Sequence, residues 1–207
     1  MSHLPTAPFP GLRALLFDVF GTVVDWRSSV AREVEELATR IGRPIDGPAF
    51  ADAWRAQYAP SMHRVRTGEL PWLTLDQLHR RSLDAILPQF GLDPLTEEER
   101  AHLTRAWGRL QPWPDAVSGL SRLKRAFVIA PLSNGNLSLM IALARYAQLP
   151  WDCVLGAELA RHYKPDPAVY QCALDLLDPA PGVRFGRYPR ADGARGRRLG
   201  QRLQRPR

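Results

Sequence analysis

Three short polar stretches carry the residues of this sequence that could do chemistry, and the first contains Asp18. This residue follows the apolar run 14–17 and precedes Phe20, Gly21 and Thr22, which favour a tight loop. A carboxylate at the end of a buried strand is a candidate nucleophile or metal ligand, since ligands of open α/β sheets bind there. The alternative is an aspartate that only ends the strand.

The second and third stretches supply an anion-binding turn and a lysine. The apolar run 127–132 ends in the polar sequence Ser-Asn-Gly-Asn at 133–136, whose hydroxyl, amide and backbone N–H groups suit an anion. An ordinary strand-to-helix loop would have the same composition. Lys164 is one of two lysines among 28 basic residues, and it stands just before a predicted helix. Where arginine is used so heavily, a lysine indicates a need for a compact point charge.

Three apolar runs must form the strands that position these groups, at 14–17, 127–132 and 153–156. Each is short and continuous, which is typical of parallel strands buried on both faces. The carboxyl ends of parallel strands meet at one edge of a sheet. We therefore expect Asp18, the turn at 133–136 and Lys164 to lie together.

A long helical block separates the first two strands. Apolar periodicity predicts helices at about 28–41, 48–65, 74–87 and 96–110, with Ser28 or Ser29 capping the first and a capping box at 96–99. About ninety residues are too many for a simple crossover, so the block predicts a helical insert. Trp54 and Arg55 lie on its second helix. A tryptophan in such a stripe is usually core, and a lone arginine is usually a surface group.

Composition and charge exclude several classes of protein. No apolar run approaches the roughly 18 residues of a membrane span, and the first residues lack the pattern of a secretory signal. The two cysteines, far apart in sequence, fit a reduced, cytoplasmic setting. Residues 184–207 hold nine Arg and one Asp, which gives them a net charge of +8. The whole chain has a net charge of +7, so residues 1–183 carry a net charge of −1. This basic tail lacks a recognisable nucleic-acid motif, and nucleic acid is not the expected partner.

The three stretches together resemble a known family. Residues 18–22 (Asp-Val-Phe-Gly-Thr), 132–135 (Leu-Ser-Asn-Gly) and 163–166 (Tyr-Lys-Pro-Asp) are similar to the first three motifs of the haloacid dehalogenase superfamily, over about 12–177. The resemblance implies an α/β fold: a Rossmann-like parallel-sheet core with a helical cap inserted after the first strand. It divides the chain into a core domain (11–24 and 112–183), a cap (25–111) and a basic, disordered tail (184–207).

The branch of the superfamily follows from position 20. Phosphatases of this superfamily carry a second aspartate there as general acid and base, and Phe20 cannot transfer a proton. The insert and the sequence around Trp54 and Arg55 resemble the type II 2-haloacid dehalogenases, including members that act on fluoroacetate. The implied activity is hydrolysis of short 2-haloalkanoic acids without metal or cofactor. A Mg²⁺-dependent phosphatase, an inactive truncated chain and a protein that binds through its basic tail remain the alternatives.

The resemblance implies a role for each catalytic candidate. Asp18 would attack the carbon that bears the halogen and form an ester. Arg55 would stabilise the departing halide. Lys164 would keep Asp18 ionised, since a nearby cation favours a charged carboxylate. Thr22 would hold Asp18 by a hydrogen bond.

The substrate-binding candidates are carried over in the same way. Ser133 and Asn134 would hold the substrate carboxylate. Phe20 and Trp54 would wall a dry pocket, which makes a poorly hydrated carboxylate more nucleophilic. Tyr170 also matches a family position, and as a tyrosine it suits the core equally well.

The resemblance ends near Leu177, before the fourth motif of the family. From there the chain is rich in Arg, Gly and Pro, which predicts an incomplete core sheet and a disordered ending. A shifted reading frame in a GC-rich gene is one hypothesis, and a genuine short variant is the other. Family members often dimerise through the insert, so the resemblance makes a homodimer possible, while the missing sheet edge leaves the oligomeric state open.

Overall fold

Three parallel strands form the central sheet of the computed structural model, which describes residues 12–177. Strand β1 (Ala14–Phe17) pairs with β4 (Val128–Ser133), and β4 pairs with β5 (Leu155–Gly156). Phe17, the last residue of β1, lies opposite Pro131. The strand predicted at 153–156 is shorter than expected. The parallel order confirms that the predicted strands end at the same edge.

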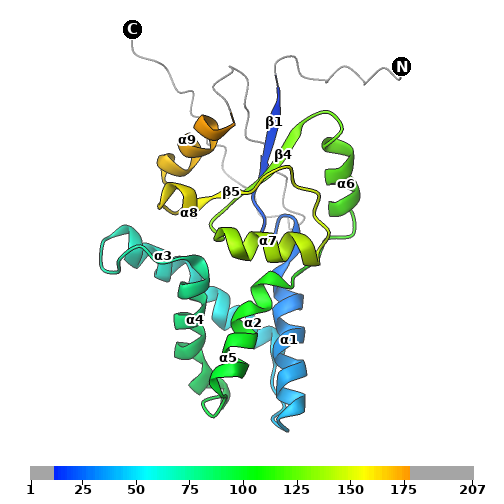
Figure 1. Cartoon of the computed structure of the whole chain (residues 1–207). Helices are drawn as coiled ribbons and strands as arrows, with labels where there is room; N and C mark the ends of the chain where they lie inside the picture. The colour runs from blue at the N-terminus through cyan, green and yellow to red at the C-terminus, as the bar shows by residue number, and fades with distance from the viewer. Residues whose placement is uncertain (1–11, 178–207) are drawn as a thin grey trace, which may run out of the picture.

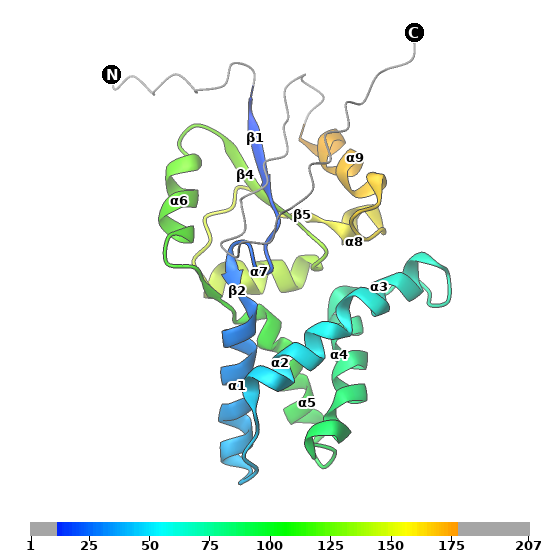
Figure 2. The same cartoon turned by 180° about the vertical axis from the view of Figure 1, so that it is seen from behind.

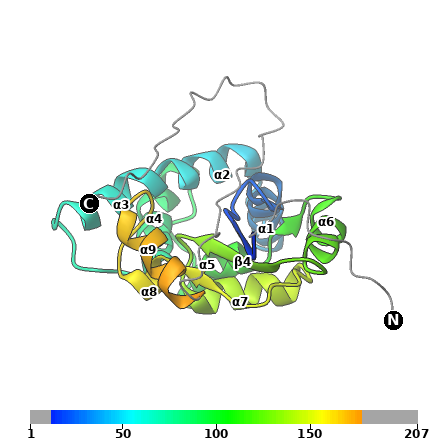
Figure 3. The ribbon, with the colours of Figure 1, turned by 90° about the horizontal axis from the view of Figure 1, so that it is seen from above.

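Four helices flank this sheet: α6 (Ala116–Leu123), α7 (Leu137–Tyr146), α8 (Ala157–Ala160) and α9 (Pro167–Leu176). Helices α8 and α9 lie side by side near β5 (Figures 1 and 3). A small apolar cluster joins the strands to α9 and includes Leu16, Leu132 and Val169. Helix α7 also contacts the cap, at the segment 105–108. Helix α7 is thus one of the elements through which the core contacts the insert.

The insert after β1 is a helical cap (Figures 1 and 2). Its elements are α1 (Trp26–Arg40), α2 (Gly47–Ala56), α3 (Tyr58–Arg66), α4 (Leu75–Ile86), η1 (Leu87–Phe90), α5 (Glu97–Thr104) and η2 (Arg105–Gly108). A two-stranded antiparallel ribbon, β2 (Val24–Asp25) with β3 (Gln111–Pro112), joins the two ends of this insert. The ribbon lies near both predicted domain boundaries, and the exact division stays a prediction.

Helix α1 begins two residues earlier than predicted, at Trp26. Its cap is Asp25, whose carboxylate accepts a hydrogen bond from the backbone N–H of Ser28 (3.1 Å). Ser29, the other predicted cap, is buried inside the helix, where its hydroxyl accepts from the backbone N–H of Gln111 (2.9 Å). A carboxylate at a helix N-terminus also interacts favourably with the helix dipole.

The single helix predicted at 48–65 is two helices, because α2 ends at Ala56 and α3 begins at Tyr58. Pro60 explains the break. Proline has no N–H to donate to the carbonyl of residue 56, and its ring crowds that same carbonyl. The interruption places Arg55 in the last turn of α2 and Tyr58 at the start of α3, so the two side chains meet at a corner.

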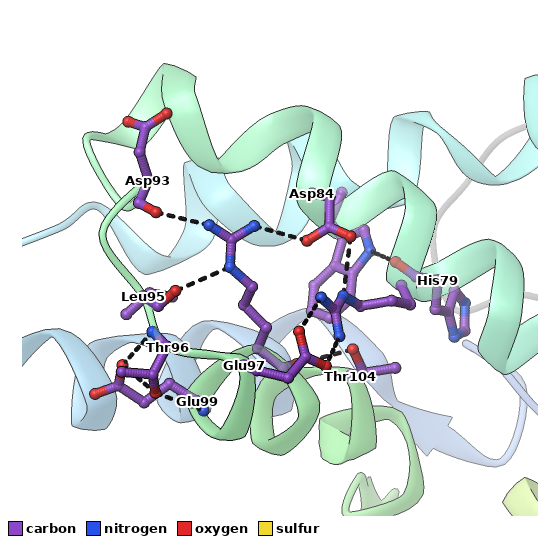
Figure 4. Close-up of polar contacts among 11 residues, drawn as sticks. His79, Asp84, Asp93, Leu95, Thr96, Glu97, Glu99 and Thr104 are labelled. Atoms are coloured by element: carbon purple, nitrogen blue, oxygen red, sulfur yellow. Dashed lines mark hydrogen bonds and ion pairs between the residues drawn. The ribbon is translucent and has the colours of Figure 1, made fainter.

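Charged side chains tie α4 to α5 on the outside of the cap (Figure 4). Arg80 pairs with Asp84 and Glu97, and Arg100 donates to Asp84 (2.8 Å). The predicted capping box of α5 is confirmed: the Thr96 hydroxyl and the Glu99 carboxylate each accept from the other's backbone N–H. Figure 4 shows the His79 ring turned away from this network. The ion pairs thus hold α4 with His79 facing the cap interior.

Several predictions concern residues that the structure leaves undescribed. The basic tail 184–207, its predicted disorder and the predicted loss of strands after 177 lie outside the described residues. Within residues 12–177, no helix is long and apolar enough to cross a membrane. In the same residues, no group of three or more His, Cys, Asp or Glu side chains is placed to hold a metal ion.

Candidate active site

Asp18 lies directly after β1, and two predicted partners hold its carboxylate. The Thr22 hydroxyl donates to Oδ2 (3.0 Å), and Lys164 Nζ donates to Oδ1 (2.8 Å) across 146 residues of sequence. Gly21, with φ +85°, lets the loop turn back so that Thr22 reaches the strand end. The Lys164 side chain is 15% exposed and that of Asp18 is 53% exposed. The carboxylate of Asp18 is thus oriented at the sheet edge with one side open.

The predicted turn after β4 packs beside this pair. Asn134 is buried: its Oδ1 accepts from the backbone N–H of Lys164 (2.7 Å), and its Nδ2 donates to the Tyr58 hydroxyl (3.1 Å). Ser133 is fully buried, and its hydroxyl oxygen accepts from the backbone N–H of Gly135 (3.0 Å). The side chains of the turn therefore contact Lys164 and Tyr58 and also shape the loop that is predicted to bind an anion.

Arg55 reaches this edge from the cap and lies against aromatic rings. Its guanidinium carbon is 3.9 Å from the centre of the Tyr58 ring and 5.4 Å from that of Trp26. Its Nη1 is buried and has no hydrogen-bond partner among residues 12–177. A buried guanidinium nitrogen without an acceptor is costly unless an anion binds it. This arrangement is not that of a solvated surface arginine.

The other predicted pocket residues differ in position. Phe20 is buried within the loop that follows Asp18 (residues 18–22), with its ring edge-on to Trp107 at 5.9 Å. Trp54 is fully buried, donates to the backbone carbonyl of His79 (3.0 Å) and belongs to the cap interior. Tyr170 is half-buried on α9 and packs against the small cluster under the sheet. The substrate-binding roles of these three residues stay predictions.

Sequence reasoning missed contacts that join the cap to the core. Tyr58 accepts from Asn134, and burial raises the pKa of its hydroxyl, a shift that the charge of Arg55 opposes and that of Asp18 reinforces. Asn136 donates to the Asp76 carboxylate (2.9 Å) and accepts from the Asp76 backbone N–H (3.1 Å). In the sequence, Tyr58 belongs to a stripe with Phe50 and Trp54 at intervals of four residues, a pattern that indicates core packing and does not indicate contact with Asn134.

The charges at the site suit a small anionic substrate. Lys164 and Arg55 supply two positive charges and Asp18 one negative charge, so the arrangement is net positive before anything binds. A carboxylate substrate would balance this charge. A halide that leaves toward Arg55 would gain a cation where negative charge develops.

Comparisons with known proteins identify the family. A family model of haloacid dehalogenase-like hydrolases matches residues 12–184. The (S)-2-haloacid dehalogenase 1 of a Pseudomonas species is 34% identical over 174 residues, 82% of this chain and 73% of that protein.

Solved structures agree in fold. A defluorinating L-2-haloacid dehalogenase is 47% identical with a TM-score of 0.78, over 80% of this chain and 69% of that one. The L-2-haloacid dehalogenase of Xanthobacter autotrophicus, solved with chloropropionic acid covalently bound, is 31% identical with a TM-score of 0.71, over 84% and 69%. Together with the oriented carboxylate of Asp18 and the phenylalanine at position 20, these likenesses set the phosphatase alternative aside. The chain belongs to the haloacid dehalogenase-like hydrolases and, among them, to the 2-haloacid dehalogenases.

Proposed function

We propose that this protein hydrolyses short 2-haloalkanoic acids of the haloacetate type to 2-hydroxy acids through an ester on Asp18. The observation that carries the proposal is the combination of an oriented carboxylate, held by Thr22 and Lys164, with the guanidinium of Arg55, whose Nη1 is buried and has no hydrogen-bond partner among residues 12–177. One group can attack a carbon while the other accepts the anion that leaves it. Similarity to enzymes named for this reaction supports the same activity.

The first half of the reaction is a displacement. A carboxylate oxygen of Asp18 attacks C2 of the substrate, a new C–O bond forms, and the carbon–halogen bond breaks with its electron pair leaving as halide. Arg55 stabilises that developing charge. Lys164 and Thr22 hold the nucleophile in position, so that less orientational freedom is lost in the reacting complex. The backbone N–H groups of the turn at Ser133 and Asn134 would receive the substrate carboxylate.

The second half regenerates the enzyme. Water attacks the ester carbonyl carbon of Asp18, the ester bond breaks, and the 2-hydroxy acid leaves with one proton released to the solvent. The total is one haloacid and one water converted to one hydroxy acid, one halide and one proton. Displacement at C2 inverts the configuration, so (S)-2-chloropropionate is expected to give the (R)-2-hydroxy acid.

Peptide mass spectrometry tests this mechanism. The purified protein is incubated with chloroacetate, quenched and digested, with Asp18→Asn as the matched control. A carboxymethyl ester on the Asp18 peptide of the wild type, absent from the control, is expected together with chloride in solution. An adduct that persists without turnover would show that this chain performs only the displacement. Neither adduct nor chloride from a folded protein would refute the proposal.

We further propose a reduced, cytoplasmic setting, which the cysteine usage favours, and a homodimer, which the family resemblance suggests. The thiols of Cys153 and Cys172 are free, which fits a reducing compartment. Sedimentation velocity of the purified protein checks the assembly, and a single monomeric species across micromolar concentrations would contradict it.

A further inference from the structure

Unpaired buried nitrogens gather in one part of the cap. Among residues 12–177, the buried side-chain polar atoms without a hydrogen-bond partner are Arg55 Nη1, both ring nitrogens of His79 and Trp107 Nε1. His79 is 3% exposed and Trp107 is 1% exposed. Each unpaired donor costs on the order of 1–3 kcal/mol when no acceptor is present. Three neighbouring side chains with this same feature indicate an acceptor that the chain itself does not supply.

Arg55, His79 and Trp107 belong to one cluster of packed rings beside the loop 18–22 that follows Asp18. The His79 ring is stacked on Trp107, with centroids 4.3 Å apart and planes at 18°. Trp107 also stacks on Trp26 (6.3 Å), and Arg55 lies over Trp26. On another side Trp107 meets Phe20, two residues after Asp18. The cluster therefore extends from Phe20, in the loop 18–22, to His79 in the cap, and Arg55 packs against it through Trp26.

The chemistry of the cluster fits a small anion. Burial, and then the charge of Arg55, lowers the pKa of His79 to about 3, so the imidazole is neutral near pH 7 and offers one N–H. The indole of Trp107 is a donor only, and the guanidinium of Arg55 is cationic. No carboxylate is paired with any of the three among the described residues. Donors and positive charge without a counter-ion favour a halide.

We propose that His79 and Trp107, together with Arg55, form the leaving-group site and that their N–H groups make it competent for fluoride. The inference rests on the proposed function and extends it to carbon–fluorine bonds. Fluoride is the smallest halide and concentrates its charge most, so its departure depends more on hydrogen-bond donors than that of chloride. Donors placed where charge develops act most strongly when they are held in position and shielded from water.

The step is the displacement already described, with fluorine as the leaving atom. A carboxylate oxygen of Asp18 forms a bond to C2 of fluoroacetate, and the C–F bond breaks with its electron pair remaining on fluoride. Arg55, Trp107 and His79 donate hydrogen bonds to the ion without transferring a proton. The fluoride then leaves as a solvated anion, and water hydrolyses the ester as before.

The decisive experiment compares two substrates in matched variants. His79→Phe keeps an aromatic ring on Trp107 and removes both nitrogens, while His79→Gln restores one N–H donor. His63→Phe, at an exposed position on α3, is the control. Release of fluoride from fluoroacetate and of chloride from chloroacetate is measured as kcat/KM by ion chromatography.

We expect His79→Phe to lower kcat/KM for fluoroacetate at least about tenfold more than for chloroacetate, as loss of a transition-state donor does. Partial recovery in His79→Gln and no change in His63→Phe complete the expected pattern. Equal effects on both substrates, or none, would overturn the inference. Wild-type protein that releases chloride but no fluoride would overturn it and leave the proposed function standing. No halide from either substrate would refute the proposed function itself.

A titration of the wild type tests the site even if a variant fails to fold. In protein labelled with ¹⁵N at histidine, sodium fluoride is added and the His79 imidazole signals are followed by NMR. A bound anion should shift the N–H proton downfield and raise the pH at which the ring titrates. Signals that do not respond to fluoride up to high millimolar concentration would overturn the inference.

Discussion

Acidification should destabilise this protein through His79 by an amount that the structure allows us to work out. The folded state holds the ring buried and neutral with a pKa of about 3, whereas an unfolded chain titrates it near its ordinary value of 6.5. The unfolded state therefore binds more protons below pH 6.5. The stabilisation that the neutral ring contributes to the folded state is fully present above pH 6.5 and is lost as the pH falls toward 3.

The magnitude follows from the two pKa values. Between pH 7.5 and pH 5 the protonation of the unfolded histidine lowers the free energy of unfolding by about 2 kcal/mol, at a limiting slope of roughly 1.4 kcal/mol per pH unit. This is a large share of the roughly 5–15 kcal/mol typical of a folded domain. Protonation of carboxylates with lowered pKa values, such as Glu33 and Asp152, also lowers the stability of the protein in acid. The contribution of His79 is therefore measured as a difference between variants.

Urea unfolding followed by circular dichroism measures this difference. Wild type, His79→Phe and His63→Phe are compared at pH 7.5 and pH 5. We expect the loss on acidification to be about 2 kcal/mol smaller in His79→Phe than in the other two proteins. A loss of equal size in all three would refute the reasoning, because it would mean that the ring is accessible to protons in the folded state.

Three further predictions concern the nucleophile and the contacts between cap and core. Asp18→Asn should leave no halide release above background, measured by ion chromatography, with unfolding unchanged by more than about 1 kcal/mol because the side chain is half exposed. Asn136→Ala should lower the free energy of unfolding by roughly 1–3 kcal/mol, measured in urea, since it leaves the part-buried groups of Asp76 without their partner. Tyr58→Phe removes the acceptor of the Asn134 amide and should lower kcat/KM for chloroacetate about tenfold, equivalent to about 1.4 kcal/mol.

The sequence predicted that Asp18 and Lys164 lie at one edge of the sheet because a general rule of topology applies to them. Asp18 and Lys164 are 146 residues apart, and nothing local links them. The rule that parallel strands share a carboxyl edge nevertheless brings them together, and the structure joins them at 2.8 Å. The helical insert was equally predictable, since its apolar periodicity and its length leave few alternatives.

The interior of the cap was not predictable in the same way. His79 lies on α4 among Leu75, Leu78 and Leu83, so the sequence pattern predicts only that it is a core residue. Periodicity shows which face of a helix is buried and does not show which helix packs against that face. The stacking of His79 on Trp107 and the unpaired nitrogens that follow from it depend on the packing of α4 against the segment 105–108. The break between α2 and α3 could have been predicted from the sequence, because Pro60 has no N–H to donate within a continuous helix.

Asn134 connects the core side of the predicted site to the cap side. These two contacts account for a polar side chain that is buried at this position. Its carbonyl oxygen accepts from the backbone N–H of Lys164 on the core, and its amide donates to Tyr58 on the cap. Tyr58 in turn lies under the guanidinium of Arg55. Lys164, predicted to hold the nucleophile, and Arg55, predicted to receive the halide, are therefore linked through one side-chain amide. Because the same amide contacts core and cap, the packing of the cap against the core fixes the positions of both groups together.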